Sequence, residues 1–338
     1  QQHIELDAYL SERLEQAKNE SSSFLRPDFS SIEAYKTSIS LYRKMFFESI
    51  GYPPPGSKKN AEPRIKFVAE DAAAKIYRVW VEVMDGVDAY GIYMIPKNLK
   101  GKAPLLISQH GGGGCSETTV AIGPRAVYHE MGREAVKRGY IVWAPGLLAR
   151  VTYGGDPVIE ETSRSIIDQK ARLLGTSLTA IQIFKIIQST EALIKTRPEI
   201  DAGRVGMAGI SMGGGYTLLT AAASPLIKVG VSAALFTDKE ERFKRISFDD
   251  PEKRADMNVL RRFGNAQLVG LICPRPMMVA MGVNDPVIPI VGARKERPKA
   301  ELFYQKLGIP DRFEFFEHSG GHEFHLESLF RFLDKHLK

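Results

Sequence analysis

The chain has 338 residues, of which 43% are hydrophobic and 25% are charged. This is the balance of a globular protein with enough apolar material for a buried sheet, and it excludes disorder over most of the length. The net charge of +6 comes from lysines and arginines scattered among acids. Nucleic-acid binding needs a concentrated basic stripe, so no nucleic-acid partner is expected.

Other broad classes are excluded by cysteine content and hydropathy. Two cysteines cannot build a disulfide framework, and neither has a CxxC partner for a metal. Apolar runs such as residues 229–236 reach only strand length, so no membrane span is expected. The chain begins Gln-Gln without a leader, which fits a processed secreted or periplasmic protein and a trimmed chain equally well. The compartment and the oligomeric state stay open.

The first 63 residues differ in pattern from the rest. Apolar positions recur at helical spacing over residues 4–17 and 32–50. The stretch "GYPPPGSKKNAEP" (residues 51–63) then predicts an extended linker, because consecutive prolines exclude a helix. We therefore expect residues 1–63 to form a helical extension and linker packed on a catalytic domain of residues 64–338.

Strand and helix patterns alternate from there onward. Strands at 74–83 and 89–95 are expected to form a hairpin around Asp85-Gly86. Further strands are predicted at 103–109, 140–146, 205–208, 229–236, 276–281 and 312–316, with helices at 124–137 and 166–194, after Ser211, near 300–306 and from about Glu323. This alternation predicts an α/β protein with a mostly parallel, doubly wound sheet after an initial antiparallel hairpin. Reactive groups in such sheets gather beyond the carboxyl ends of the strands.

The stretch "RVGMAGISMGGGY" (residues 204–216) matches G-x-S-x-G at Gly209, Ser211 and Gly213. A serine on a tight strand-to-helix turn needs small residues two positions away on either side, so that strand and helix can approach. The turn raises the hydroxyl above the sheet, beside a helix N-terminus that favours developing negative charge. This pattern predicts Ser211 as a nucleophile.

A rival interpretation takes the same glycines as a cradle for a dinucleotide phosphate. Gly209, Gly213 and Gly215 fit the spacing found in short-chain dehydrogenases. In that family, however, the motif follows the first strand, and a Tyr-x-x-x-Lys pair lies downstream. Here the motif lies past mid-chain, and neither Tyr216 nor Tyr304 has lysine four residues on. No organic cofactor is therefore expected.

The stretch "SQHGGGGCS" (residues 108–116) follows a predicted strand directly. Glycines there let backbone N–H groups point into the site and stabilise a carbonyl oxygen that gains charge. The expected oxyanion donors are the N–H of Met212 and one from Gly112 or Gly113. We expect His110 to brace this loop by hydrogen bonding.

An acid and a base are predicted after later strands. Asp285, in "VAMGVNDPVIP" (residues 279–289), can hold an imidazole in the correct tautomer, with Asp238 as the alternative. In "FEHSGGHEFH" (residues 316–325), His322 lies in a loop behind two glycines and is favoured over His318 and His325 as the base. Those glycines break the helix that would align the histidines on zinc, so no metal site is expected.

The order Ser211, Asp285, His322 is that of α/β-hydrolases. With "HGGGG", "GISMGG", "GVNDPVIP" and "GGHEF", residues 74–338 resemble the dienelactone hydrolase, acetyl xylan esterase and prolyl oligopeptidase-like group of that superfamily. The resemblance implies the α/β-hydrolase fold, this triad, and the N–H groups of Met212 and Gly112 as oxyanion donors. It also implies acetyl or related esters on carbohydrates as substrates.

Two departures from the resembled families bear on the substrate. Dienelactone hydrolases proper have cysteine where this chain has Ser211. Cephalosporin-C deacetylase-type esterases carry Arg-Gly-Gln and Ser-Gln-Gly motifs, where this chain has "GLLARVTYGG" and Ser-Met-Gly. Segments 147–164 and 238–267 are expected to shape the pocket, with Arg150 and Tyr153 as candidate substrate contacts.

The sequence thus predicts a serine esterase that acts through an acyl-enzyme on a small-molecule or carbohydrate ester. The alternatives are a serine peptidase of the prolyl oligopeptidase-like group and a non-catalytic binding protein on the same fold.

Overall fold

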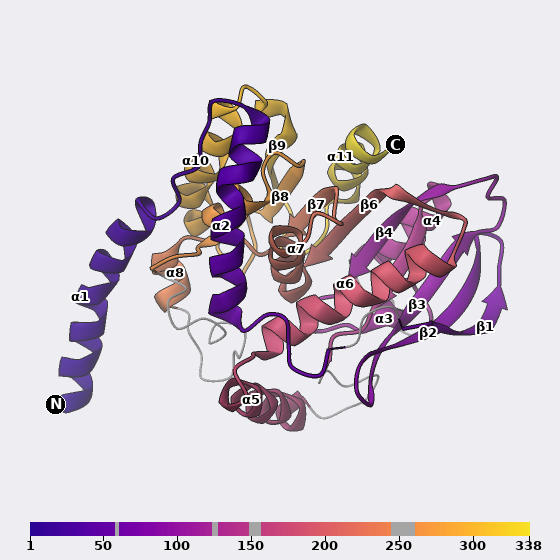
Figure 1. The fold of residues 1–338 in the computed structure, drawn as a ribbon, viewed down its shortest axis with the longest axis horizontal. Coiled ribbons are helices and arrows are strands. Elements are labelled where there is room, and N and C mark those ends of the chain that lie inside the picture. Colours follow the sequence, from indigo (N-terminus) through magenta and orange to yellow (C-terminus); the bar gives the residue numbers. More distant parts are fainter. Residues whose placement is uncertain (58–60, 124–127, 149–156, 245–260) are drawn as a thin grey trace.

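A computed structural model describes residues 1–57, 61–123, 128–148, 157–244 and 261–338. Its strands form a nine-stranded sheet in the order β1-β2-β3-β5-β4-β6-β7-β8-β9 (Figure 1). The strands are β1 Arg64–Glu70, β2 Ala74–Met84, β3 Val87–Pro96, β4 Ala103–Gln109, β5 Ile141–Pro145, β6 Ile200–Ile210, β7 Val229–Ala233, β8 Met277–Gly282 and β9 Phe313–His318. Neighbours from β1 to β5 are antiparallel, and all neighbours from β5 to β9 are parallel. The predicted hairpin and mostly parallel sheet are confirmed.

Helices cover both faces of the sheet (Figure 1). They are α1 Gln2–Ser22, α2 Ile32–Ile50, α3 Ser116–Thr119, α4 Met131–Lys137, α5 Pro157–Leu173, α6 Leu178–Thr196, α7 Met212–Ala223, α8 Lys239–Lys244, α9 Asn265–Ile272, α10 Ile290–Lys306 and α11 Leu326–Leu337, with short 3-10 turns η1 Tyr128–Glu130 and η2 Pro310–Arg312. Side chains of α2, α6, α7, α9 and α10 build the larger core, and those of α4 and α11 the smaller one. Among the described helices, none combines the length and apolar character needed to cross a bilayer.

The central strands are buried along their whole length. Every residue of β4, β5, β7 and β8 is buried, whereas burial alternates along β2 nearer the edge. Strands covered on both faces need apolar side chains on both faces, which explains their continuous apolar runs. This core fixes the carboxyl edge at which the loops after β4, β6, β8 and β9 emerge.

The predicted single helix over residues 166–194 is wrong, because the chain breaks between α5 and α6. Gly175 adopts φ 79°, and Ser177 begins α6 by accepting a hydrogen bond from the Ala180 N–H at 3.1 Å. The hydroxyls of Thr176 and Ser177 also donate to the carbonyls of Gly51 and Ile50, each at 2.7 Å. The break is therefore held by the end of α2, a contact that periodicity does not reveal.

Several short elements were not predicted. The edge strand β1 has an almost fully exposed pattern, and α3, α8 and α9 contain too few residues for a periodic signal. The predicted helix over 124–137 shortens to α4 behind the turn η1, and residues 124–127 lie outside the described part. Helix α6 is buried on nearly every side, so its sequence is apolar rather than amphipathic.

Helix α2 joins the main core rather than lying on its surface. The Tyr35 hydroxyl donates to the Gly270 carbonyl at 2.7 Å, and Arg43 donates to the carbonyls of Ala222 and Leu271 at 3.0 and 2.9 Å. Helix α1 projects from the molecule at its N-terminal end (Figure 1), whereas Lys18 and Glu20 near its C-terminal end pair with Glu240 and Arg261. These contacts support the proposal that residues 1–63 form an extension packed on a domain of residues 64–338.

Candidate active site

Ser211 lies on a sharp turn between the end of β6 and the start of α7. Its backbone has φ 55° and ψ −124°, a conformation that a non-glycine residue adopts only when the surrounding structure imposes it. The N–H of Ser211 donates to the Ala233 carbonyl at 2.8 Å, and its carbonyl accepts from the Gly215 N–H at 3.0 Å. The turn therefore has its backbone groups paired while the side chain stands at the carboxyl edge of the sheet.

The glycines on either side of Ser211 are sterically required. A Cβ on Gly209 would lie 2.2 Å from the Gly213 carbonyl oxygen, and one on Gly213 would lie 2.4 Å from that of Gln109. Both contacts are with backbone, which cannot move without distorting β4 or the turn itself. The steric reason predicted for the G-x-S-x-G spacing is therefore confirmed.

We expect Gly213→Ala to lower the free energy of unfolding by about 1–3 kcal/mol, because the new methyl group overpacks a backbone contact. The matched control is Gly215→Ala, also in α7. Its Cβ would lie 3.3 Å from Leu235 Cδ2, at the flexible end of a side chain. We expect that variant to be neutral or stabilised, since alanine is the better helix former. Urea unfolding of both measures the difference, and equal midpoints would contradict the steric argument.

Asp285 and His322 come together beyond the ends of β8 and β9. His322 Nδ1 lies 2.8 Å from Asp285 Oδ2, and the Asp285 side chain is completely buried. Its other oxygen, Oδ1, accepts from the N–H groups of Val287 and Ile288 at 2.7 and 3.0 Å. An ionised carboxylate only accepts, so the neutral imidazole of His322 carries its proton on Nδ1, and its Nε2 is then the acceptor.

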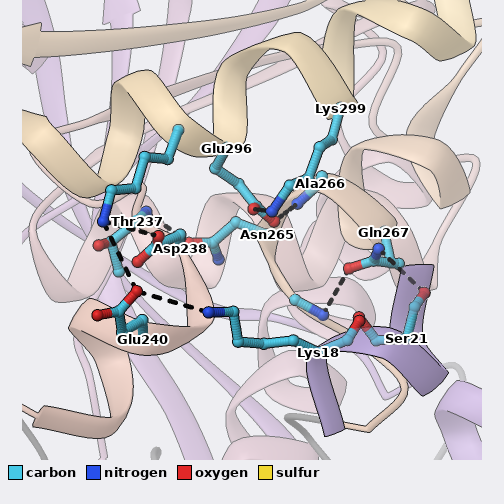
Figure 2. A network of polar contacts seen from close by, with 12 residues as sticks. Lys18, Ser21, Thr237, Asp238, Glu240, Asn265, Ala266, Gln267, Glu296 and Lys299 are labelled. Atoms are coloured by element: carbon cyan, nitrogen blue, oxygen red, sulfur yellow. Dashed lines mark hydrogen bonds and ion pairs between the residues drawn. The ribbon is translucent and has the colours of Figure 1, made fainter. Parts of the chain in front are cut away.

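Asp238, the alternative acid, is engaged elsewhere. Its Oδ1 accepts from the Glu241 N–H at 2.9 Å at the start of α8, and its Oδ2 lies 3.8 Å from Lys295 Nζ. Figure 2 shows Asp238 in a polar network between α8 and α10 that Lys18 of α1 also joins through Glu240. This surrounding favours Asp285 as the acid.

The alternative histidines have structural partners. His318 Nδ1 accepts from the Gly320 N–H at 3.2 Å, and burial lowers the pKa of His318. His325 precedes α11, and its Nδ1 accepts from the Ser328 N–H at 3.3 Å. Within the described ranges, no three His, Cys, Asp or Glu side chains are grouped as metal ligands.

The glycine-rich loop after β4 lies directly against the serine turn. A Cβ on Gly111 would be 2.9 Å from the Ile210 carbonyl oxygen and 3.2 Å from Ser211 Cβ. Gly112 and Gly113 form the turn that follows, closed by a 3.3 Å hydrogen bond from the Gly114 N–H to the Gly111 carbonyl. This adjacency puts both candidate donor segments, the loop and the start of α7, beside Ser211.

His110 braces that loop, as predicted. Its buried ring donates from Nδ1 to the Gly111 carbonyl at 2.8 Å, and Nε2 accepts from the Leu147 N–H at 3.0 Å. His110 therefore ties the loop after β4 to the loop after β5.

Sequence reasoning missed the buried polar side chains that hold the end of β5. Lys185 of α6 donates to the Gly146 carbonyl, Gln182 to that of Leu148 at 3.1 Å, and Gln109 to that of Pro145 at 3.2 Å. Lys185 and Gln182 lie in the mostly apolar helix α6, and Gln109 ends the buried strand β4. Only the polarity of these residues at buried positions could have revealed them. Arg150 and Tyr153, the predicted substrate contacts, lie outside the described residues.

Burial lowers the pKa of Lys185 from 10.5 to about 7. Between these values the unfolded chain binds the proton that the folded chain has released, so stability contributed by this group rises with pH. From pH 7 to pH 10 we expect the free energy of unfolding of wild type to rise relative to that of Lys185→Met, by up to about 1.4 kcal/mol per pH unit. The exposed Lys195→Met on the same helix should show no such slope in urea titrations.

Comparisons with known proteins agree with this architecture. The model of the dienelactone hydrolase family matches residues 119–242, a span that includes Ser211 but ends before Asp285 and His322. A Bacteroides fragilis NCTC 9343 protein described as an acetyl xylan esterase superposes with a TM-score of 0.70 at 16% identity, covering 90% of this chain and 80% of its own. The chain has the α/β-hydrolase fold.

Two further comparisons cover most of the chain. A glucuronoyl esterase from Solibacter usitatus superposes with a TM-score of 0.69 at 14% identity, covering 94% of this chain and 97% of its own. YtaP of Bacillus subtilis (strain 168), whose name describes it as a hydrolase, is 25% identical over 288 residues, 83% of this chain and 92% of its own. The predicted fold is thus confirmed.

Proposed function

We propose that this protein is a serine esterase in which Ser211 is the nucleophile, His322 the general base and Asp285 the residue that orients the base. The observation that carries the proposal is the 2.8 Å contact between His322 and a fully buried Asp285, at the sheet edge that also bears the Ser211 turn. A buried carboxylate fixes the imidazole tautomer and stabilises its charged form.

The proposed reaction has two halves. His322 Nε2 takes the proton of the Ser211 hydroxyl while the serine oxygen attacks the ester carbonyl carbon. The tetrahedral intermediate collapses, the alcohol leaves with the proton held by His322, and an acyl-serine remains. Water then attacks the acyl-serine with the same base, which releases the carboxylic acid and restores Ser211.

Charge on the carbonyl oxygen would be stabilised by backbone donors. The N–H of Met212 at the start of α7 and that of Gly112 or Gly113 are the proposed pair, because the glycine loop lies against Ser211. Each such donor is worth about 3 kcal/mol in acyl transfer. The chemistry needs no metal or organic cofactor.

We propose carbohydrate esters as the substrate class. The support is that structural relatives are named acetyl xylan and glucuronoyl esterases. These names represent two kinds of ester: an acetyl group on a sugar hydroxyl, and a uronic acid carboxyl esterified to an alcohol. Screening purified protein on acetylated xylan and on a glucuronate ester distinguishes these two kinds by the product released. A feruloyl ester in the same screen tests a third acyl group.

The decisive test is covalent labelling. We expect a fluorophosphonate probe to modify the wild-type protein at Ser211, as read by peptide mass spectrometry, and to block hydrolysis of p-nitrophenyl acetate. A protein that neither takes the label nor hydrolyses short acyl esters would be a binding protein on this fold. Cleavage of peptide substrates in preference to esters would indicate the peptidase instead.

A further inference from the structure

One pair of side chains, Glu323 and His129, joins the loop that carries His322 to the turn η1. Glu323 directly follows His322, and its Oε1 accepts from the Gly321 N–H at 3.2 Å. Its Oε2 lies 2.8 Å from His129 Nε2, a residue of η1 that is 194 positions away in the chain. The carboxylate thus holds the backbone beside the proposed base to a distant segment.

The loop that carries His322 needs such support because it contains two adjacent glycines. On one side, Asn284 holds it: its N–H donates to the Gly320 carbonyl at 3.1 Å, and its side chain to the Ser319 carbonyl at 2.7 Å. Glu323 holds the other side. A Cβ on Gly320 would lie 2.0 Å from Glu323 Oε1, so the carboxylate packs directly against the backbone of Gly320.

The segment that supplies His129 also lies against the glycine-rich loop. Tyr128, His129 and Glu130 have φ values of 59°, 52° and 54°, three consecutive non-glycine residues in the left-handed region. Such backbone persists only where neighbouring contacts impose it. The Tyr128 hydroxyl would lie 3.1 Å from a Cβ on Gly111, so this segment adjoins the loop beside Ser211 as well as the His322 loop.

We infer that Glu323, paired with His129, is a positioning residue that fixes the His322 loop relative to the glycine-rich loop. The inference rests on the proposed serine esterase function. The hydrogen bond from His129 lowers the pKa of Glu323. Because both side chains are exposed, the contact between them contributes little to the free energy of unfolding, so its effect should appear in the placement of the base.

The test compares Glu323→Ala and His129→Ala with Glu317→Ala, a control that removes a similar exposed pair between Glu317 of β9 and Arg294 of α10. We expect the first two to lower kcat about tenfold with KM nearly unchanged, because small misplacement of a catalytic group is costly. Combining them should add little to either alone. His129→Gln keeps an N–H donor and should restore most of the rate, and Glu317→Ala should match wild type.

A second readout needs no activity. Hydrogen exchange of the peptide spanning residues 318–325 should accelerate in Glu323→Ala and His129→Ala but not in Glu317→Ala, at unchanged urea midpoints. Unchanged exchange and kcat in an active enzyme would overturn the inference. A wild type that hydrolyses no ester would instead overturn the proposed function, with the exchange result still deciding whether Glu323 holds the loop.

Discussion

Replacing Ser211 with alanine is expected to lower kcat for a short acyl ester by at least about 10⁴-fold, with the fold retained. The alanine has no oxygen to attack the ester, so only binding and oxyanion stabilisation remain to assist water. Steady-state hydrolysis of p-nitrophenyl acetate measures the loss, and the fluorophosphonate label should vanish in the same variant.

The control for this variant is Ser40→Ala, a serine exposed on α2 whose hydroxyl donates to the Thr37 carbonyl. Its kcat should equal that of wild type. Urea unfolding of Ser211→Ala should show a midpoint no lower than that of wild type, because the strained turn loses no backbone hydrogen bond. Substantial residual kcat in Ser211→Ala would place the nucleophile elsewhere.

Replacing Asp285 with asparagine is expected to lower kcat about 10³- to 10⁴-fold, and the hydrogen bonds of Asp285 explain why. Two N–H groups, those of Val287 and Ile288, point at Oδ1, so asparagine would keep its oxygen there. Its NH₂ group would then face His322 Nδ1. The imidazole would have to accept at Nδ1 and carry its proton on Nε2, where it cannot take the serine proton.

Asp238→Asn is the matched control, since it makes the same change in the alternative acid. Asp238 accepts from the Glu241 N–H at the start of α8, so we expect a stability loss of about 1 kcal/mol at most and kcat within a few-fold of wild type. The pH dependence of kcat and urea unfolding, measured on both variants, distinguish a residue that orients His322 from one that only stabilises the start of α8. The reverse pattern, with activity lost only in Asp238→Asn, would make Asp238 the acid.

Much of the site's framework was predictable because it depends on local geometry. Gly209 and Gly213 flank Ser211 at fixed positions along one turn, and the contacts that forbid a side chain at either arise wherever such a strand meets such a helix. The central strands could be predicted for a similar reason, since burial on both faces demands a continuous apolar run. The hydrogen-bonding role of His110 followed from its place beside the glycines.

Tertiary contacts decided what local pattern left open. The chain breaks between α5 and α6 because Thr176 and Ser177 bond to the end of α2, and periodicity carries no trace of so distant a partner. Asp238 and Asp285 both follow strands, and only the fold determines which one meets His322. Lys185 and the His129–Glu323 pair were invisible for the same reason: their partners come from other elements. Sequence by itself determined the turn and the strands, where causes lie within a few residues, and tertiary structure alone determined which distant side chains became neighbours.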